Sequence, residues 1–299
     1  RYFVRPLPAG SPSSSTLTLR TVTPRAIAVG EPASSTLGED ALWAFDGVAG
    51  QPIDIQVTAD NGETASVALW TETGQWLTSG SQPMRDAGAD IDGYILPAPG
   101  RYLVRIDDID PATRYEMTVA TARTRAIQPG DVVPSTMVSD TLWTLDAVAG
   151  QVLDIAMSTT DSSFDPYLTL YDASGVRLAS DDDSGGNLNA RISLFVAPAT
   201  GRYVVRAGRP SDRAVPYKPS VRTVQPSQIA LGETKGSTTR EVELWQFHGQ
   251  AGQVVEMAMS TTDPSFDPYL TLFTATGQHL AENDDIAAAR VVIVSPCTS

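Results

Sequence analysis

Hydrophobic and polar residues alternate over short stretches of this chain, and the same alternation returns at intervals of 100 to 102 residues. Residues 140–148 and 152–158 show it most clearly, with Trp143 and Ile155 on the apolar side of their stretches. A period of two residues is typical of a strand that buries one face. We therefore predict two strands that face a common core and form a hairpin that turns at Gly150.

Further short apolar runs follow in the same part of the sequence, and no stretch keeps a helical period over three turns. Turns rich in proline, glycine, aspartate and asparagine separate the runs. The additional predicted strands cover residues 167–171, 191–196, 202–206 and 217–224, with an acidic loop at 181–189. This spacing predicts an all-β fold built of antiparallel β-sandwiches of the jelly-roll kind.

Three sequence repeats are marked by a tryptophan in the pattern Leu-Trp-x-(Phe/Leu), each followed by Ala-Gly-Gln. The tryptophans are Trp43, Trp143 and Trp245. Each alternates with an apolar residue two positions later, so we expect all three to be core anchors rather than ligand platforms. The predicted domains are a first β-sandwich at 23–122, a second at 123–224, and an incomplete third at 225–299.

The last strands of the third repeat are missing from its own end, and their equivalent stands at residues 1–22. The segment Arg1-Tyr2-Phe3-Val4-Arg5 matches residues 202–206, and 20–22 match 222–224. Residues 1–22 are therefore predicted to be donor strands that complete the third sandwich. The residues expected to fill its core are Tyr2, Val4, Leu17, Leu19 and Val22.

An open third repeat would leave about five large apolar side chains uncovered, which corresponds to at most about 8 to 15 kcal/mol. This is as large as the typical stability of a whole domain, about 5 to 15 kcal/mol, and an unpaired sheet edge also invites aggregation. Three arrangements can fill the gap. The donor strands can come from another copy, which propagates head to tail, the chain can be a slice of a longer array, or its two ends can close a ring.

Composition limits the partners. The net charge is −14 and the only lysines are Lys218 and Lys235, so a nucleic acid would be repelled. No apolar run reaches the roughly 18 to 20 residues that span a bilayer. The single cysteine, Cys297, cannot form a disulfide within the chain.

Residues 163–172, with the sequence Ser-Phe-Asp-Pro-Tyr-Leu-Thr-Leu-Tyr-Asp, are followed by Gly175, an Asp-Asp-Asp run at 181–183 and Gly-Arg-Tyr at 201–203. This series resembles the bacterial pre-peptidase C-terminal domain, and the third repeat carries it again from Phe266 onward. The resemblance implies compact β-sandwiches of secreted enzymes, often calcium-dependent, some of which bind insoluble substrates such as collagen. We expect no peptidase domain within residues 1–299.

Clustered carboxylates suggest a calcium site in the second and third repeats, because Ca²⁺ takes six to eight oxygen ligands. Ordinary solvated turn residues are the alternative. The first repeat has Thr64, Gly80, Ser81 and Gln82 at these positions and should bind no metal. The predicted ligands are Asp165, Asp181, Asp182 and Asp183 in the second repeat, and Asp267, Asn283, Asp284 and Asp285 in the third.

Catalysis is not expected. His248 and His279 each occur in one repeat only, at positions where the other repeats carry different residues, and Cys297 has no histidine beside it in the sequence. We interpret the chain as a structural subunit of an extracellular or cell-surface filament or matrix, which assembles with itself head to tail. The alternative is a non-catalytic, substrate-binding appendage of a larger secreted peptidase, with an extracellular polymer as its ligand.

Overall fold

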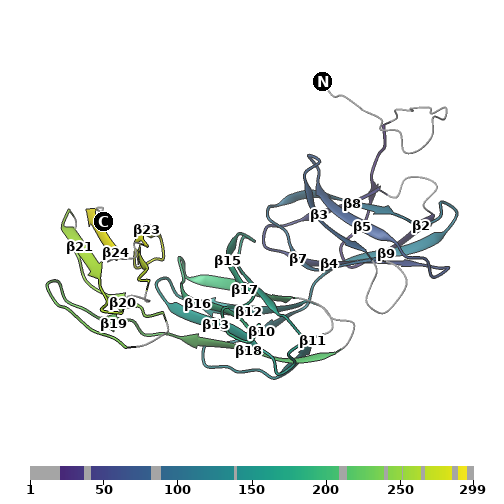
Figure 1. Cartoon of the computed structure of the whole chain (residues 1–299). Coiled ribbons are helices and arrows are strands. Elements are labelled where there is room, and N and C mark those ends of the chain that lie inside the picture. The colour runs from purple at the N-terminus through teal and green to yellow at the C-terminus, as the bar shows by residue number, and fades with distance from the viewer. Residues whose placement is uncertain are drawn as a thin grey trace, which may run out of the picture.

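A computed structural model describes residues 21–36, 42–81, 89–137, 140–208, 214–238, 242–250, 252–263, 267–284 and 289–294. Every regular element in these ranges is a strand, which confirms the all-β prediction. The strands gather into three successive groups along the chain, from the purple end to the yellow end of Figure 1. No helix long and apolar enough to cross a membrane is found in the described ranges.

Repeat 1 is a sandwich of two sheets, with strand orders β1-β3-β8-β5-β6 and β2-β9-β4-β7. The later strands β8 and β9 each lie between two other strands, so they hold their sheets together from the centre. The strands are β1 (Arg25–Ala26), β2 (Pro32–Thr36), β3 (Leu42–Gly47), β4 (Pro52–Ala59), β5 (Ser66–Thr71), β6 (Trp76–Ser81), β7 (Ala89–Ile95), β8 (Gly100–Asp107) and β9 (Arg114–Thr121).

Repeat 2 has the same topology, with sheets β10-β12-β17-β14-β15 and β11-β18-β13-β16. Here β17 and β18 take the central places. The strands are β10 (Thr124–Ala126), β11 (Ser135–Met137), β12 (Thr141–Ala147), β13 (Val152–Ser158), β14 (Tyr167–Asp172), β15 (Arg177–Asp181), β16 (Ala190–Val196), β17 (Gly201–Gly208) and β18 (Val215–Thr223).

The predicted hairpin is wrong, because the two strands that Gly150 joins belong to different sheets. Strand β12 pairs with β10 and β17, whereas β13 pairs with β16 and β18. The turn carries the chain across the sandwich, so Trp143 and Ile155 meet in one core from opposite sides. Alternation predicted the buried faces correctly, but it does not specify which strands pair.

Both complete repeats anchor their core in the same way. Trp43 and Trp143 are buried, as predicted, and each indole nitrogen donates a hydrogen bond to a tyrosine hydroxyl in the opposite sheet. The bonds reach Tyr115 at 2.7 Å and Tyr217 at 3.3 Å. These bonds satisfy the polar atoms of two large buried rings.

Repeat 3 is divided into three small sheets among the described residues: β19-β20, β21-β24 and β22-β23. The described residues include no strand between β20 and β22, where β17 lies in repeat 2, and none beside β21 at the place of β18. The strands are β19 (Ser227–Gln228), β20 (Trp245–Gln246), β21 (Val254–Met259), β22 (Leu270–Phe273), β23 (His279–Asn283) and β24 (Ala289–Val294).

The core residues of repeat 3 are correspondingly less covered. Trp245 is half-buried, whereas Trp143 is buried. Leu270 and Leu272 are also half-buried, although their counterparts Leu168 and Leu170 are almost completely enclosed. This lower coverage coincides with the absence of the two central strands from the described residues.

Candidate functional site

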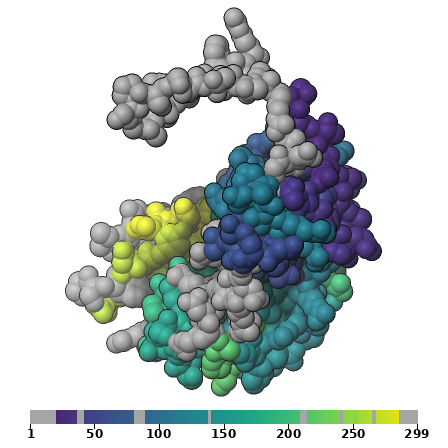
Figure 2. Space-filling view, turned by 90° about the vertical axis from the view of Figure 1, so that its right-hand side faces the viewer, coloured from purple at the N-terminus to yellow at the C-terminus, as the bar shows by residue number. Residues whose placement is uncertain are grey.

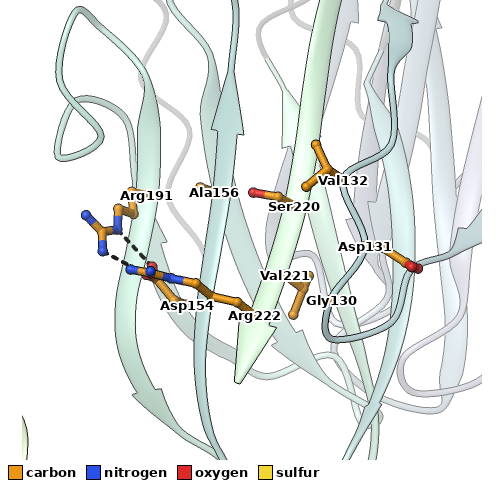
Figure 3. A pocket seen from close by; sticks show the side chains of 9 residues that line it. All are labelled: Gly130, Asp131, Val132, Asp154, Ala156, Arg191, Ser220, Val221 and Arg222. Atoms are coloured by element: carbon orange, nitrogen blue, oxygen red, sulfur yellow. Dashed lines mark hydrogen bonds and ion pairs between the residues drawn. The ribbon is translucent and has the colours of Figure 1, made fainter. Parts of the chain in front are cut away.

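A hollow of about 350 Å³ lies on the outer face of the β11-β18-β13-β16 sheet. Figure 3 shows Asp154 among the residues that line it, with the side chains of Arg191 and Arg222 meeting the carboxylate. Asp154 stands at a β-bulge in β13, Arg191 on β16 and Arg222 on β18, so three neighbouring strands place one carboxylate between two guanidinium groups. The Asp154 side chain is only 3% exposed.

Hydrogen bonds use both oxygens of this carboxylate. Arg191 binds it in a bidentate manner, with Nε 2.9 Å from Oδ1 and Nη2 2.7 Å from Oδ2, and Arg222 Nε lies 2.6 Å from Oδ2. Burial alone would raise the pKa of Asp154, but the hydrogen bonds and charges of the two arginines outweigh it and hold the pKa below its ordinary value. A carboxylate that is ionised and fully engaged is suited to holding strands together rather than to proton transfer.

Repeat 1 does not build the same cluster. Its equivalent carboxylate, Asp54, has Asp90 and Ala120 at the positions of Arg191 and Arg222. Asp54 Oδ1 accepts a hydrogen bond from the Gly93 backbone nitrogen at 2.8 Å. Burial, opposed by this bond, raises the pKa of Asp54. The carboxylate bound by two arginines is therefore absent from repeat 1, whereas repeat 3 carries Glu256 and Arg290 at the positions of Asp154 and Arg191.

A second set of contacts joins repeat 1 to repeat 2. A small apolar cluster contains Ile95 and Ala122 from repeat 1 and Leu142, Val204 and the partly buried Tyr171 from repeat 2. Figure 2 shows the blue surface of repeat 1 lying directly on the teal surface of repeat 2. The two repeats are therefore held together by packed side chains as well as by the chain that links them.

Charged groups border this cluster. Arg206 of β17 donates a hydrogen bond to the Asp92 backbone oxygen across the junction at 3.3 Å, and it forms an ion pair with Asp140. Burial, together with Asp90, Asp54 and Asp140, raises the pKa of Asp92 to about 6, although Arg206 lowers it. Sequence reasoning missed this junction because its residues come from separate stretches of two repeats.

The predicted calcium ligands of repeat 2 lie on and around the loop after β15. Asp181 Oδ1 accepts hydrogen bonds from the backbone nitrogens of Ser184 at 3.1 Å and Arg191 at 2.6 Å, so this carboxylate fixes the loop and the start of β16. Asp182 and Asp183 are exposed, and Asp165 is half-buried. Among the described residues, no three His, Cys, Asp or Glu side chains converge as a metal site would require.

The equivalent residues of repeat 3 are only partly described. Asp267 and Asp284 are exposed and Asn283 is half-buried at the end of β23, while Asp285 lies outside the described residues. With the ligand sets in this arrangement, the calcium site stays a prediction.

The remaining candidate residues are the two histidines, Cys297 and the predicted donor residues. His279 on β23 lies 3.3 Å from a Glu282 carboxylate oxygen and meets the Phe273 ring edge-on. His248 lies outside any strand, four residues before Gly252. Cys297 and the donor residues Tyr2, Val4, Leu17 and Leu19 lie outside the described residues, while Val22 is described and exposed.

Comparison with known proteins agrees with the resemblance seen in the sequence. Residues 141–208 match the family described as the bacterial pre-peptidase C-terminal domain, which confirms the predicted resemblance over most of repeat 2. No curated protein matches the chain.

Three solved structures that are similar to parts of this chain have low sequence identity to it. The pre-peptidase C-terminal domain of a collagenase from Bacillus anthracis is 14% identical, covering 33% of this chain and 95% of that domain, with a TM-score of 0.30. PliG of Aeromonas hydrophila, a periplasmic inhibitor of g-type lysozyme, is 14% identical over 34% of this chain and 100% of its own, with a TM-score of 0.25. The CUB1-EGF-CUB2 region of human MASP-1/3 is 8% identical over 64% of this chain and 99% of its own, with a TM-score of 0.20.

Proposed function

We propose that the chain is a non-catalytic structural subunit of a secreted assembly, in which residues 1–22 of one copy complete repeat 3 of another. The observation that carries this proposal is the division of repeat 3 into three two-stranded sheets exactly where repeats 1 and 2 place a central strand. A strand added between β20 and β22 would restore a five-stranded sheet, and a second beside β21 would extend the β21-β24 sheet to three strands. This is strand addition, in which main-chain hydrogen bonds give affinity and alternate side chains give specificity.

The donor residues match buried positions in the complete repeats. By sequence alignment, Tyr2 and Val4 correspond to Tyr203 and Val205 of β17, and Leu19 corresponds to Val221 of β18. All three counterparts are buried in the core of repeat 2. The alternation in residues 1–22 is therefore the alternation that the gap in repeat 3 requires.

One hydrogen-bond pattern strengthens the correspondence. The Tyr203 hydroxyl donates to the Ala199 backbone oxygen at 2.6 Å, and Tyr102 bonds Ala98 in the same way in repeat 1. In each repeat the tyrosine of Gly-Arg-Tyr thus ties the preceding loop to the central strand. In the proposed assembly Tyr2 would bond the backbone of Cys297, which aligns with Ala199.

A substrate-binding appendage of a secreted peptidase is the second candidate. The observation that favours it is the family match at residues 141–208. Such an appendage needs no donor strand from a second copy, so it would be monomeric in solution.

Deletion of residues 1–22 separates the two candidates. The intact chain should form polymers in negative-stain micrographs and in sedimentation velocity, and the deletion variant should remain monomeric with an early, separate unfolding step for repeat 3. A synthetic peptide of residues 1–22 should bind the deletion variant and raise the temperature of that step. The matched control is the same peptide with Tyr2→Asp and Val4→Asp, which should do neither.

A deletion variant that still polymerises and melts like the intact chain would contradict strand donation. An intact chain that is monomeric at all concentrations, with repeat 3 as stable as repeat 2, would favour the appendage.

A further inference from the structure

The junction between repeats 1 and 2 depends on two glycines that leave no room for a side chain. A Cβ placed on Gly50 would lie 2.0 Å from the Ala173 carbonyl oxygen, and one on Gly175 would lie 2.5 Å from the Leu96 carbonyl oxygen. The Ile95 Cγ2 atom lies 3.2 Å from the same position on Gly175. Only glycine permits this close approach of two backbones.

The junction between repeats 2 and 3 uses the same positions one repeat later. A Cβ on Gly150 would lie 2.8 Å from the Ala275 carbonyl oxygen, and one on Gly277 would lie 2.6 Å from the Val196 carbonyl oxygen and 3.2 Å from its Cβ. These four residues stand 100 to 102 positions after Gly50, Ala173, Gly175 and Ile95. Both junctions therefore place the same two glycines against carbonyls of the neighbouring repeat, although Gly277 faces Val196, one position before the counterpart of Leu96.

Each half of this interface also occurs once without a partner among the described residues. Gly252 continues the series of Gly50 and Gly150, and Gly74 precedes the series of Gly175 and Gly277. Both keep the positive φ of their counterparts, at 75° and 85°, yet a Cβ on either would meet no described atom within 4 Å. Among the described residues, the half of the interface around Gly252 in repeat 3 and the half around Gly74 in repeat 1 are therefore both without a contact.

The side chains around Gly74 fit the same interface. Leu42, Trp70 and Leu103 stand at the positions of Leu142, Tyr171 and Val204, and they are partly exposed where Leu142 and Val204 are buried at the junction. We call these three residues the repeat 1 face. Glu72 replaces Ala173 and Ala275, but the contact there is made by a main-chain carbonyl, so the change of side chain does not remove it.

An arginine marks the same face. Arg206 crosses the junction to the Asp92 backbone oxygen, whereas its counterpart Arg105 bonds Asp107 on its own strand at 2.8 Å and is 58% exposed. The exposed ion pair between Arg105 and Asp107 contributes little to stability. Arg105 can therefore leave Asp107 and bond to a neighbouring molecule.

We infer that the repeat 1 face binds the Gly252 end of repeat 3 in a second copy of this chain, so that the junction inside the chain is formed a third time between copies. The inference rests on the proposed function in one respect, since donated strands would bring Val22 to the position that Ala122 occupies in the junction between repeats 1 and 2. An interface that joins two different surfaces propagates and does not close on a dimer. With the same junction throughout, the subunit boundary would be geometrically equivalent to the boundaries between repeats.

Oxidative footprinting of the intact chain tests this contact. Trp70 belongs to the repeat 1 face, and Leu188, which is 43% exposed in the acidic loop of repeat 2, serves as the internal reference. On assembly, modification of Trp70 should fall several-fold relative to Leu188. Leu103→Arg should weaken assembly about tenfold or more, because it places an unpaired charge in an apolar contact, while the control Val132→Arg, at an exposed site of repeat 2, should leave assembly unchanged.

The outcomes distinguish this inference from strand donation. Polymers that form with Trp70 still fully reactive, and that tolerate Leu103→Arg, would overturn the junction and leave strand donation intact. Concentration-dependent association that protects Trp70 but does not require residues 1–22 would support the junction and overturn strand donation. A chain that shows neither polymers nor Trp70 protection would overturn both.

Discussion

Equivalent aspartates can have opposite effects on stability, as Asp54 and Asp154 show. Both stand at the bulge of a core strand, on β4 and β13, and both are withdrawn from solvent. Asp154 is bound by two arginines and its pKa is lowered, whereas the pKa of Asp54 is raised. A lowered pKa means that the ionised form stabilises the fold, and a raised pKa means that it destabilises the fold.

Replacing Asp154 by asparagine should destabilise repeat 2 by about 3 kcal/mol at pH 7, because it leaves two arginines without their buried partner. The contribution of Asp154 is present above the ordinary aspartate pKa of about 3.9 and is lost as the pH falls through the lower pKa of the folded state. The destabilisation by Asp154→Asn should therefore become smaller toward acid pH. Urea unfolding of repeat 2 followed by hydrogen exchange between pH 3 and 7 measures both effects.

The matched control is Asp54→Asn in repeat 1. Its amide oxygen can still accept the Gly93 hydrogen bond, and no ion pair is removed, so repeat 1 should be unchanged or slightly more stable at pH 7. Equal destabilisation by both variants would show that the arginines around Asp154 contribute nothing specific.

This cluster could not be predicted from the sequence. Arg191 and Arg222 lie 37 and 68 residues from Asp154, and repeat 1 replaces them by Asp90 and Ala120. Three residues this far apart in the sequence form no local motif, and repeat 1 does not carry the two arginines. The tryptophan anchors, by contrast, were predictable because each lies in an alternating stretch that occurs again one repeat away.

At the scale of the element, strand positions were more predictable than strand partners. The predicted strands at 152–158, 191–196 and 202–206 agree with β13, β16 and β17 within two residues at each end. Alternation determines which side chains are buried, but it is the same whether the following strand pairs in its own sheet or crosses to the other. The tight turn at Gly150 was therefore misinterpreted as a hairpin.

The acidic loops at the ends of β15 and β23 are the elements where calcium is predicted to act. Extracellular modules bind Ca²⁺ with dissociation constants of about 10⁻⁴ to 10⁻³ M. At a free Ca²⁺ concentration of about ten times the dissociation constant, the ion should add about 1.4 kcal/mol per site to the free energy of unfolding. Hydrogen exchange of the whole chain in calcium and in chelator should show slower opening of repeats 2 and 3, with repeat 1 unchanged.

The exposed residues Asp182 and Asp183 supply the control. Their joint replacement by asparagine should abolish the calcium effect in repeat 2 only, while leaving the bonds of Asp181 to Ser184 and Arg191 in place. An equal calcium effect in all three repeats, or none in any, would identify the acidic residues as ordinary solvated turns.

At the scale of the whole molecule, the junctions decide whether the repeats act as one body. The recurrence of Gly50, Gly150 and Gly252 was visible in the sequence, but a glycine after a strand is first interpreted as a turn residue. Its second role, close contact with the next repeat, requires the positions of Ala173 and Ala275, which only the fold supplies. Interfaces between repeats are therefore the part of this molecule that local patterns predict least.

The junction between repeats 1 and 2 should be tighter at pH 5 than at pH 7.5. Asp92 lies beside it with a pKa raised to about 6, chiefly by burial and by the charges of Asp90, Asp54 and Asp140, against the opposing charge of Arg206. Protonated Asp92 favours the folded, packed state, so its contribution is complete below the ordinary aspartate pKa and is lost as the pH rises through about 6. Oxidative modification of Tyr171, which is partly buried at the junction, should be several-fold slower at pH 5 when it is measured relative to the exposed Tyr269.

Asp92→Asn is the control, because asparagine keeps the size of the side chain and does not titrate. The variant should show slow modification of Tyr171 at both pH values, while the exposed Tyr269 is modified alike in both proteins. If the variant retained the full pH dependence of the natural chain, another group at the junction would be responsible.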